Sequence, residues 1–274
     1  MLNLMYITKQ PEVARIAERA GVDWIFLDME FIGKDARQGG LDTVQNHHTI
    51  DDVIAIKGAI EKASILVRVN PIHDALPNYP SSEIEIEQAI EAGADIIMLP
   101  FFKTLQEVER FIGIVDGRVK TCLLLETPEA ARIIDDILEV KGIDMIHIGL
   151  NDMHLALGMK FMFELLANGT VDVLSSKIRA KGIPFGFGGL ATLDGGAMPG
   201  SMVLKEHYRL GSSMVIISRS FCNTSLVTDL EEVEKIFQKG IKDIRNLEQE
   251  ANEHKKYFED NRLAVIEAVR SIIN

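Results

Sequence analysis

Short apolar runs alternate along the chain with segments in which apolar residues recur every three or four positions. The short runs are rich in Leu, Ile, Val and Met, whereas the longer segments carry charged residues between their apolar positions. This alternation is typical of parallel strands that are connected by amphipathic helices. The runs with strand character are residues 2–7, 23–28, 64–69, 95–99, 119–125, 144–148, 183–187 and 213–218. We therefore predict a parallel sheet of eight strands.

Helical patterns fill most of the intervals between these strands. They cover residues 11–20, 50–63, 81–92, 104–114, 128–139 and part of 150–181. Thr49 and Asp52 have the spacing of a capping box at the start of the second helix. The strands are almost continuously apolar, as expected where helices cover a parallel sheet. Eight such units favour a closed (β/α)₈ TIM barrel over an open sheet.

The chain after the eighth strand has a different pattern. Residues 229–274 form one or two long helices, with apolar positions at helical spacing. A helix of this length exceeds what one barrel needs. We therefore assign residues 1–228 to a barrel catalytic domain and residues 229–274 to a C-terminal helical extension. The extension is expected to pack on the barrel or on a neighbouring subunit of a homo-oligomer.

Composition excludes several classes of protein. The 274 residues carry a net charge of −12, and no cluster of Lys and Arg with interleaved aromatics suggests nucleic-acid binding. No apolar stretch approaches the roughly 20 residues that span a bilayer. The N-terminus has no signal-peptide pattern, and two cysteines are too few for a disulfide framework. A cytoplasmic enzyme with a small-molecule substrate fits these features.

Acidic side chains follow several of the predicted strands. Asp28 and Glu30 lie at the end of the second strand, Glu126 follows the fifth, and Asp152 follows the sixth. Arg68 ends the third strand. Barrel active sites lie at the C-terminal ends of the strands, so these groups are predicted to meet at one rim.

Carboxylates that meet at one rim repel each other unless a cation neutralises them. Oxygen ligands with open positions suit Mg²⁺ or Mn²⁺. A 2-oxo acid can chelate such a metal through its carboxylate and keto oxygens, and the metal can stabilise the enolate that forms when a carbon–carbon bond breaks. A purely structural interpretation stays open: Glu126 can mark the entry to a helix that begins at Pro128, and Asp152 can cap the next segment.

Several segments resemble a known family. They are LDME (27–30), VRVNP (67–71), EAGADIIMLPFFKTLQEVERF (91–111), LLLET (123–127) and GIDMIHIGLNDMHLALG (142–158). Over about residues 20–160 the chain resembles the aldolase/citrate-lyase β-subunit superfamily. The resemblance is closest to its branch of metal-dependent 2-oxo acid aldolases, typified by the 4-hydroxy-2-oxoheptanedioate aldolases.

The resemblance implies roles for individual residues. It implies Glu126 and Asp152 as ligands of a divalent metal (Mg²⁺, Mn²⁺ or Co²⁺), and Arg68 as a catalytic residue that binds the substrate and stabilises the enolate. Asp28 and Glu30 are implied to bind metal-bound water. The backbone of Gly149, Leu150 and Asn151 is implied to hold the pyruvate carboxylate. The resemblance also implies a C-terminal helix exchanged between subunits, often in a hexamer that is built from dimers.

One position departs from the family pattern. Where the aldolases have a proton-transferring histidine after the Glu of the second-strand motif, this chain has Phe31. His48, or His47 beside it, lies at the end of the loop that follows and is a candidate for the missing base, although a solvated helix entry before Thr49 is an alternative for this pair. Arg219, after the eighth strand, is a candidate second anion contact. The run 186–190 (GFGGL) suggests either a phosphate-binding loop after the seventh strand or a plain glycine-rich turn.

These observations predict a carbon–carbon lyase of the metal-dependent aldolase type. Its substrate is expected to be a 2-oxo acid, which reacts through a metal-stabilised pyruvate enolate. Two alternatives stay open. One is an acyl-CoA lyase or thioesterase of the citrate-lyase β type, and the other is a barrel subunit without catalysis.

Overall fold

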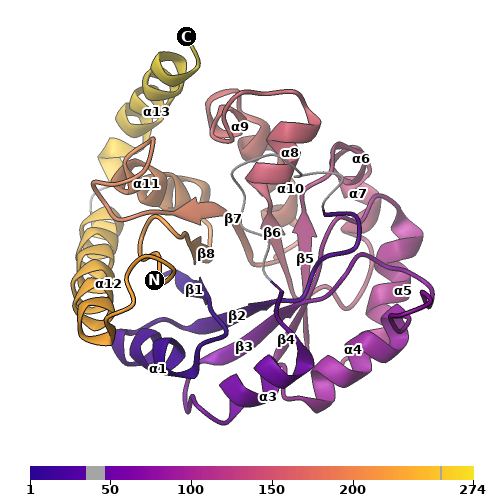
Figure 1. Cartoon of the computed structure of the whole chain (residues 1–274). Coiled ribbons are helices and arrows are strands. Elements are labelled where there is room, and N and C mark those ends of the chain that lie inside the picture. Colours follow the sequence, from indigo (N-terminus) through magenta and orange to yellow (C-terminus); the bar gives the residue numbers. More distant parts are fainter. Residues whose placement is uncertain (35–46, 254) are drawn as a thin grey trace.

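Eight parallel strands close into a barrel in the computed structural model, which describes residues 1–34, 47–253 and 255–274. The strands pair in chain order, and β8 pairs with β1 (Figure 1). They are β1 (Asn3–Ile7), β2 (Trp24–Asp28), β3 (Ser64–Arg68), β4 (Ile96–Leu99), β5 (Lys120–Leu125), β6 (Met145–Ile148), β7 (Phe185–Leu190) and β8 (Met214–Ile217). The predicted (β/α)₈ barrel is therefore confirmed, with every predicted strand in its place.

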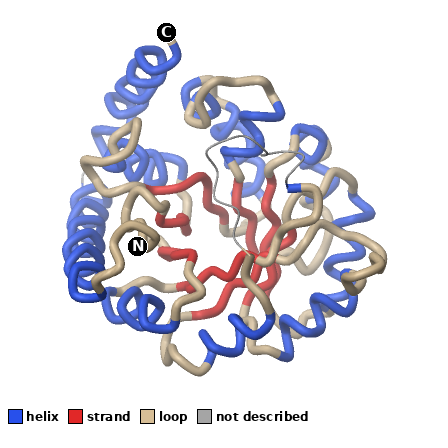
Figure 2. Tube along the Cα trace, in the orientation of Figure 1, coloured by secondary structure: helices blue, strands red, loops and turns tan. Residues whose placement is uncertain are grey.

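Helices surround the barrel on its outside (Figure 2). In chain order they are α1 (Pro11–Ala20), α3 (Ile50–Lys57), α4 (Ser82–Glu91), α5 (Leu105–Val115), α6 (Pro128–Arg132), α7 (Ile134–Ile137), α8 (Leu150–Ala156), α9 (Glu164–Ala167), α10 (Thr170–Ala180), α11 (Gly200–Leu210), α12 (Leu230–Glu253) and α13 (Phe258–Ile273). Helix α3 is shorter than predicted, but Thr49 and Asp52 form the expected capping box at its start. The segment 128–139 is divided into α6 and α7 at Ile133, whose backbone departs from helical geometry.

The core has two layers because successive side chains of a strand point to opposite faces. The barrel interior holds Met5, Phe26, Leu66, Ile96, Met98, Cys122, Leu124, Met145 and Met214. The alternate positions of the strands pack outward against the helices, in a larger cluster. Both faces of each strand are thus buried, which explains why the strands are almost continuously apolar.

The glycine-rich run 186–190 lies inside β7, so its expected position in a loop after the seventh strand is wrong. A Cβ at Gly186 would come within 2.3 Å of the Met214 carbonyl oxygen, so only glycine fits between these strands. The pairing of β7 with β8 shifts register between Gly186 and Gly189. The glycines therefore serve close strand packing and an irregular pairing.

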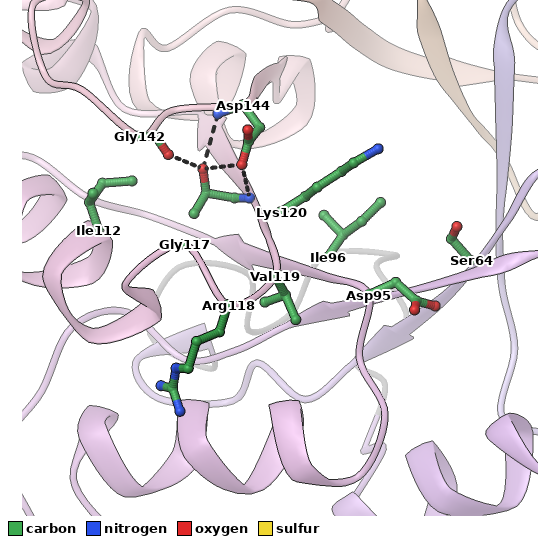
Figure 3. A pocket seen from close by; sticks show the side chains of 11 residues that line it. Ser64, Asp95, Ile96, Ile112, Gly117, Arg118, Val119, Lys120, Gly142 and Asp144 are labelled. Carbon is green, nitrogen blue, oxygen red and sulfur yellow. Dashed lines mark hydrogen bonds between the residues drawn. The ribbon is translucent and has the colours of Figure 1, made fainter.

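A repeated sequence closes the N-terminal end of the barrel. Gly-x-Asp precedes β2, β4 and β6, and each aspartate accepts a hydrogen bond of 2.8 Å from a backbone N–H of the preceding strand. The glycine of each repeat has a positive φ, between 94° and 106°. Figure 3 shows Asp144 and Gly142 in this arrangement at the cavity between β4 and β5. The polar groups at this end are therefore engaged in holding strands together.

The first helix of the C-terminal extension, α12, packs against the barrel of the same chain. Helix α12 packs on α1 and α11, and α13 packs on α11 and α9 (Figure 1). Phe237 of α12 contacts Tyr6 edge-on, with ring centroids 4.8 Å apart. Glu248 accepts a buried hydrogen bond of 2.6 Å from the backbone N–H of Leu2. Within the described chain, no helix is long and apolar enough to cross a membrane.

Candidate active site at the C-terminal rim of the barrel

A cavity of about 420 Å³ opens at the C-terminal ends of the strands. Its lining includes four of the side chains predicted to meet there: Asp28, Arg68, Glu126 and Asp152. Gly149, Leu150 and Asn151, at the start of α8, line it as well. The volume falls within the roughly 300–1,000 Å³ of ligand pockets. The structure therefore brings the predicted metal pair, Arg68 and the predicted carboxylate-binding backbone together.

Arg68 is held by a two-pronged ion pair. Its Nε donates a hydrogen bond to Asp28 Oδ1 and its Nη2 donates one to Asp28 Oδ2, both at 2.8 Å. Its Nη1 atom lies 3.5 Å from Glu30 Oε2. The register of the barrel makes this possible because Asp28 and Arg68 are paired positions on β2 and β3. A bidentate pair of this kind fixes the plane of the guanidinium and one of its edges.

Lys34 is a second cation at this place, and sequence reasoning did not single it out. Its side chain is 4% exposed, and its Nζ lies 3.0 Å from Asp28 Oδ2 and 3.6 Å from Glu30 Oε2. Burial by itself would raise the pKa of Asp28, but the charges and hydrogen bonds of Arg68 and Lys34 lower it far below its usual range. Asp28 is therefore ionised at every physiological pH.

Glu126 follows β5, and its carboxylate is fixed on two sides. Its Oε1 atom accepts a hydrogen bond of 3.0 Å from the backbone N–H of Phe101, a residue with a φ of +49°. A Cβ added to Gly149 would lie 2.7 Å from Glu126 Cβ and 2.9 Å from its Oε2. Gly149 therefore leaves the space in which the carboxylate of Glu126 lies.

Glu126 and Asp152 form a buried pair of like charges. Burial, and then the negative charge of Asp152, raise the pKa of Glu126 well above its ordinary value. The two cations Lys34 and Arg68 are already paired with Asp28 and Glu30. Glu126 and Asp152 thus bring two buried carboxyl groups together in the cavity.

The donor set of this pair fits a divalent metal. Both side chains offer carboxylate oxygens, which are the ligands that Mg²⁺ and Mn²⁺ prefer. Within residues 1–34 and 47–274 (residue 254 aside), no third His, Cys, Asp or Glu completes a cluster of three. A metal held by two carboxylates would leave its other positions to water and substrate oxygens, which is how Mg²⁺ is commonly bound.

Asn70 braces the segment between β2 and Lys34. Its Oδ1 accepts hydrogen bonds of 2.9 Å from the backbone N–H groups of Phe31 and Ile32. Its Nδ2 donates to Glu85 Oε1 at 2.8 Å, on α4. The ring of Phe31 meets Tyr79 edge-on, with centroids 4.8 Å apart. Sequence reasoning missed this brace, although Asn70 stands two residues after Arg68 in the VRVNP segment.

His48 lies behind Asp28. Its ring Nδ1 accepts a hydrogen bond of 3.0 Å from the Asp28 backbone N–H, and the backbone N–H of His48 donates to the Asp28 carbonyl oxygen at 3.3 Å. Burial lowers the pKa of His48 to about 4, so its ring is neutral at pH 7. His48 is not among the described residues that line the cavity. The structure thus places it beside the backbone of the site, with Nδ1 already engaged.

Residues 3–165 match the family model described as HpcH/HpaI aldolase/citrate lyase, which is more than half of the 274 residues. The chain belongs to this family. The resemblance stated from the motifs is confirmed, and membership of the HpcH/HpaI family supports an aldolase or lyase type of activity. No curated protein matches the sequence significantly.

Solved structures share the fold of this HpcH/HpaI family member. An HpcH/HpaI aldolase from Desulfitobacterium hafniense DCB-2 is 16% identical, with a TM-score of 0.61 over 85% of this chain and 93% of that one. An HpcH/HpaI aldolase/citrate lyase family protein from Burkholderia cenocepacia J2315 is 15% identical, with a TM-score of 0.63 over 85% and 94% of the two chains. At these identities the likeness concerns the barrel fold.

Proposed function

We propose that this chain is a metal-dependent carbon–carbon lyase that acts on a 2-oxo acid through a pyruvate enolate. The observation that carries the proposal is the buried Glu126–Asp152 pair beside Arg68 in one cavity. Glu126 and Asp152 would hold Mg²⁺, Mn²⁺ or Co²⁺. When bound, the divalent cation would supply a Lewis acid that favours negative charge on the keto oxygen of the substrate.

In the cleavage direction, the bond between C3 and C4 of a 4-hydroxy-2-oxo acid breaks. Its electron pair passes to the keto oxygen at C2 and forms the enolate, while the C4 hydroxyl gives its proton to a base and becomes an aldehyde. Protonation of the enolate at C3 then yields pyruvate. The reverse reaction joins pyruvate and an aldehyde through the same enolate.

The chain's own groups have distinct parts in this scheme. Arg68 is held rigidly by Asp28, so its guanidinium would offer a preorganised positive charge to the developing enolate oxygen. Asp28 and Glu30 would accept hydrogen bonds from water at the site. The backbone of Gly149, Leu150 and Asn151 would bind the carboxylate of pyruvate. Asp28, Glu30 and Arg68 would act without reorganising, because ion pairs already fix these three side chains.

The metal site is tested by the double variant Glu126→Gln with Asp152→Asn. Calorimetric titration with Mn²⁺ and Mg²⁺ is expected to show binding to the wild type and none to the variant, because the charged oxygens are gone. The metal-free variant is expected to melt at the same temperature or a few degrees higher, since two buried like charges no longer repel. Glu109→Gln with Asp116→Asn removes the same charge from an exposed residue of α5 and from the exposed residue that follows α5, and serves as the matched control.

The enolate is tested by deuterium exchange. Wild-type enzyme with Mn²⁺ is expected to exchange the methyl protons of pyruvate in D₂O, followed by proton NMR. The double variant should not do so, and the surface control should. Metal binding that is equal in all three proteins would contradict the proposed ligands. Wild-type enzyme that exchanges nothing with any divalent metal would contradict the lyase assignment and favour a barrel without catalysis.

His48 stays the predicted base, and the structure suggests how to separate this role from a structural one. Asn in place of His48 can still accept the hydrogen bond from the Asp28 backbone but cannot transfer a proton. If His48 is the base, His48→Asn should slow the exchange by roughly 10²–10⁴-fold. An exchange rate in His48→Asn close to that of the wild type, with a loss only in His48→Ala, would show that His48 supports Asp28 instead.

A further inference from the structure

Arg219 differs from the other cations of the cavity. Three positively charged side chains line the cavity in the described part of the chain: Lys34, Arg68 and Arg219. Lys34 and Arg68 are both paired with Asp28 and Glu30. Arg219 makes no ion pair or side-chain hydrogen bond with any residue in the described part of the chain, and it is exposed. Its five N–H donors are therefore available to a ligand.

The position of Arg219 in the barrel sets it apart from the metal pair. The residues of the proposed enolate site follow β2, β3, β5 and β6, an arc that is centred on β4. Arg219 follows β8, which lies four strands from β4 in the ring of eight and so on the far side of the rim. A molecule whose oxo-acid end lies at Glu126 and Asp152 would extend toward Arg219.

The turn that carries Arg219 is anchored to the barrel. Phe221 and Cys222 are buried, and the Tyr6 hydroxyl donates a hydrogen bond of 3.0 Å to the Cys222 carbonyl oxygen. A Cβ at Gly240 of α12 would come within 2.4 Å of the Phe221 ring, so helix and turn are in close contact. The Ser218 N–H donates to the Leu190 carbonyl oxygen at 2.9 Å. Arg219 thus stands on a fixed backbone, which lowers the entropy lost on binding.

We infer that Arg219 is a specificity-determining residue, which selects reaction partners that carry an anionic group remote from the reacting carbonyl. The inference rests on the proposed function, because it assigns the part of the substrate that the enolate site does not hold. A cavity of about 420 Å³ has room beyond a three-carbon acid. A guanidinium forms two parallel hydrogen bonds with either a carboxylate or a phosphate. The anionic group that Arg219 binds can therefore be either of the two.

The test compares matched aldehydes in condensation with pyruvate. For the carboxylate arm, the pair is 4-oxobutanoate and butanal; for the phosphate arm, it is glyceraldehyde 3-phosphate and glyceraldehyde. Wild-type enzyme is expected to prefer the anionic member of at least one pair in kcat/KM. Arg219→Gln should reduce that preference about tenfold or more, mainly through KM, because one charge-assisted contact of about 1.4 kcal/mol corresponds to a factor of ten.

Two further variants make the test specific. Arg219→Lys keeps the charge but loses the planar fork, so it should restore part of the preference. Lys120→Gln removes one positive charge at the opposite end of the barrel, where Lys120 lines the cavity in Figure 3. It should leave the preference unchanged. A similar loss in Lys120→Gln would mean that net charge, and not Arg219, selects the partner.

Other results overturn the inference. Arg219→Gln that slows anionic and neutral aldehydes equally would show that Arg219 has no part in selection. Wild-type enzyme that exchanges the protons of pyruvate but prefers neither member of either pair would overturn the inference while leaving the proposed function intact. Wild-type enzyme without any exchange would overturn both.

Discussion

Gly149 shows how one residue without a side chain determines the geometry of the site. Its backbone is in an ordinary extended conformation, with φ of −81° and ψ of 93°, so alanine would not strain the chain there. The space, however, is taken by the side chain of Glu126. The effect of a substitution at Gly149 is therefore steric and falls on the carboxylate of Glu126.

We predict that Gly149→Ala weakens metal binding about 10–100-fold, as is typical when the support of a ligand is disturbed. Calorimetry with Mn²⁺ measures this directly. Gly189→Ala is a matched control because it adds a methyl group to the same cavity, with its nearest neighbour, Ser218 Cβ, at an ordinary 3.5 Å. Equal affinities for Mn²⁺ in Gly149→Ala and wild type would contradict the position proposed for the metal.

Residues at strand ends could be predicted because a barrel gives them a common location. Asp28, Arg68, Glu126 and Asp152 each follow or end a strand, and all four line one cavity. Lys34 could not be predicted in the same way, because it lies between β2 and α3, in a segment whose path the strand pattern does not describe. Its burial depends on the ion pairs with Asp28 and Glu30, which only the folded chain forms.

At the scale of elements, hydrogen bonds of Asn70 connect the segment after β2 with the segment after β3 into one structural unit. Asn70 binds the backbone of residues 31–32 on one side and Glu85 of α4 on the other. Burial raises the pKa of Glu85 above its usual value, although Asn70 and Tyr79 donate hydrogen bonds to it. The unit places Lys34 beside Asp28 and so contributes to the charge that surrounds Arg68.

The two helices of the C-terminal extension differ in what they bury. Helix α12 contributes Val233, Phe237, Ile241 and Ile244 to the apolar layer between the strands and the surrounding helices. Helix α13 contributes Val265 and Val269, and its Asn261 donates a hydrogen bond of 2.8 Å to Glu206 on α11. Leu263 and Ile272 of α13 are exposed, at 56% and 41%. Helix α12 is therefore an integral part of the barrel fold, whereas α13 lies at its margin.

We predict that a chain ending at Glu253 keeps its helical circular dichroism and a cooperative melt, whereas a chain ending at Asp229 does not. The first loses only the contacts of α13, and the second exposes the apolar face that α12 covers. Light scattering tests the expected exchange of the C-terminal helix between subunits. A smaller assembly for the chain ending at Glu253 would support the exchange, and an unchanged mass would contradict a role of α13 in assembly.

For the whole molecule, closure of the barrel decides how charges are distributed. The chain carries a net charge of −12, yet its C-terminal rim pairs Asp28 and Glu30 with the buried Lys34 and the half-buried Arg68. Glu126 and Asp152 are buried together at the same rim, where burial and the charge of Asp152 raise the pKa of Glu126. The N-terminal end uses its aspartates to accept strand N–H groups instead. The acids at the N-terminal end thus hold neighbouring strands together, whereas those at the C-terminal end line the cavity.

The sequence by itself determined the barrel, the order of its strands and the rim at which the acids gather. Periodicity and strand ends are local properties, and a parallel barrel converts them directly into position. Only the tertiary structure decided which cations are already paired, where His48 lies and that the glycines of β7 are needed for strand packing. Those facts depend on contacts between segments far apart in the chain, such as Lys34 with Asp28 and Gly186 with Met214, and on the burial that gives such contacts their strength.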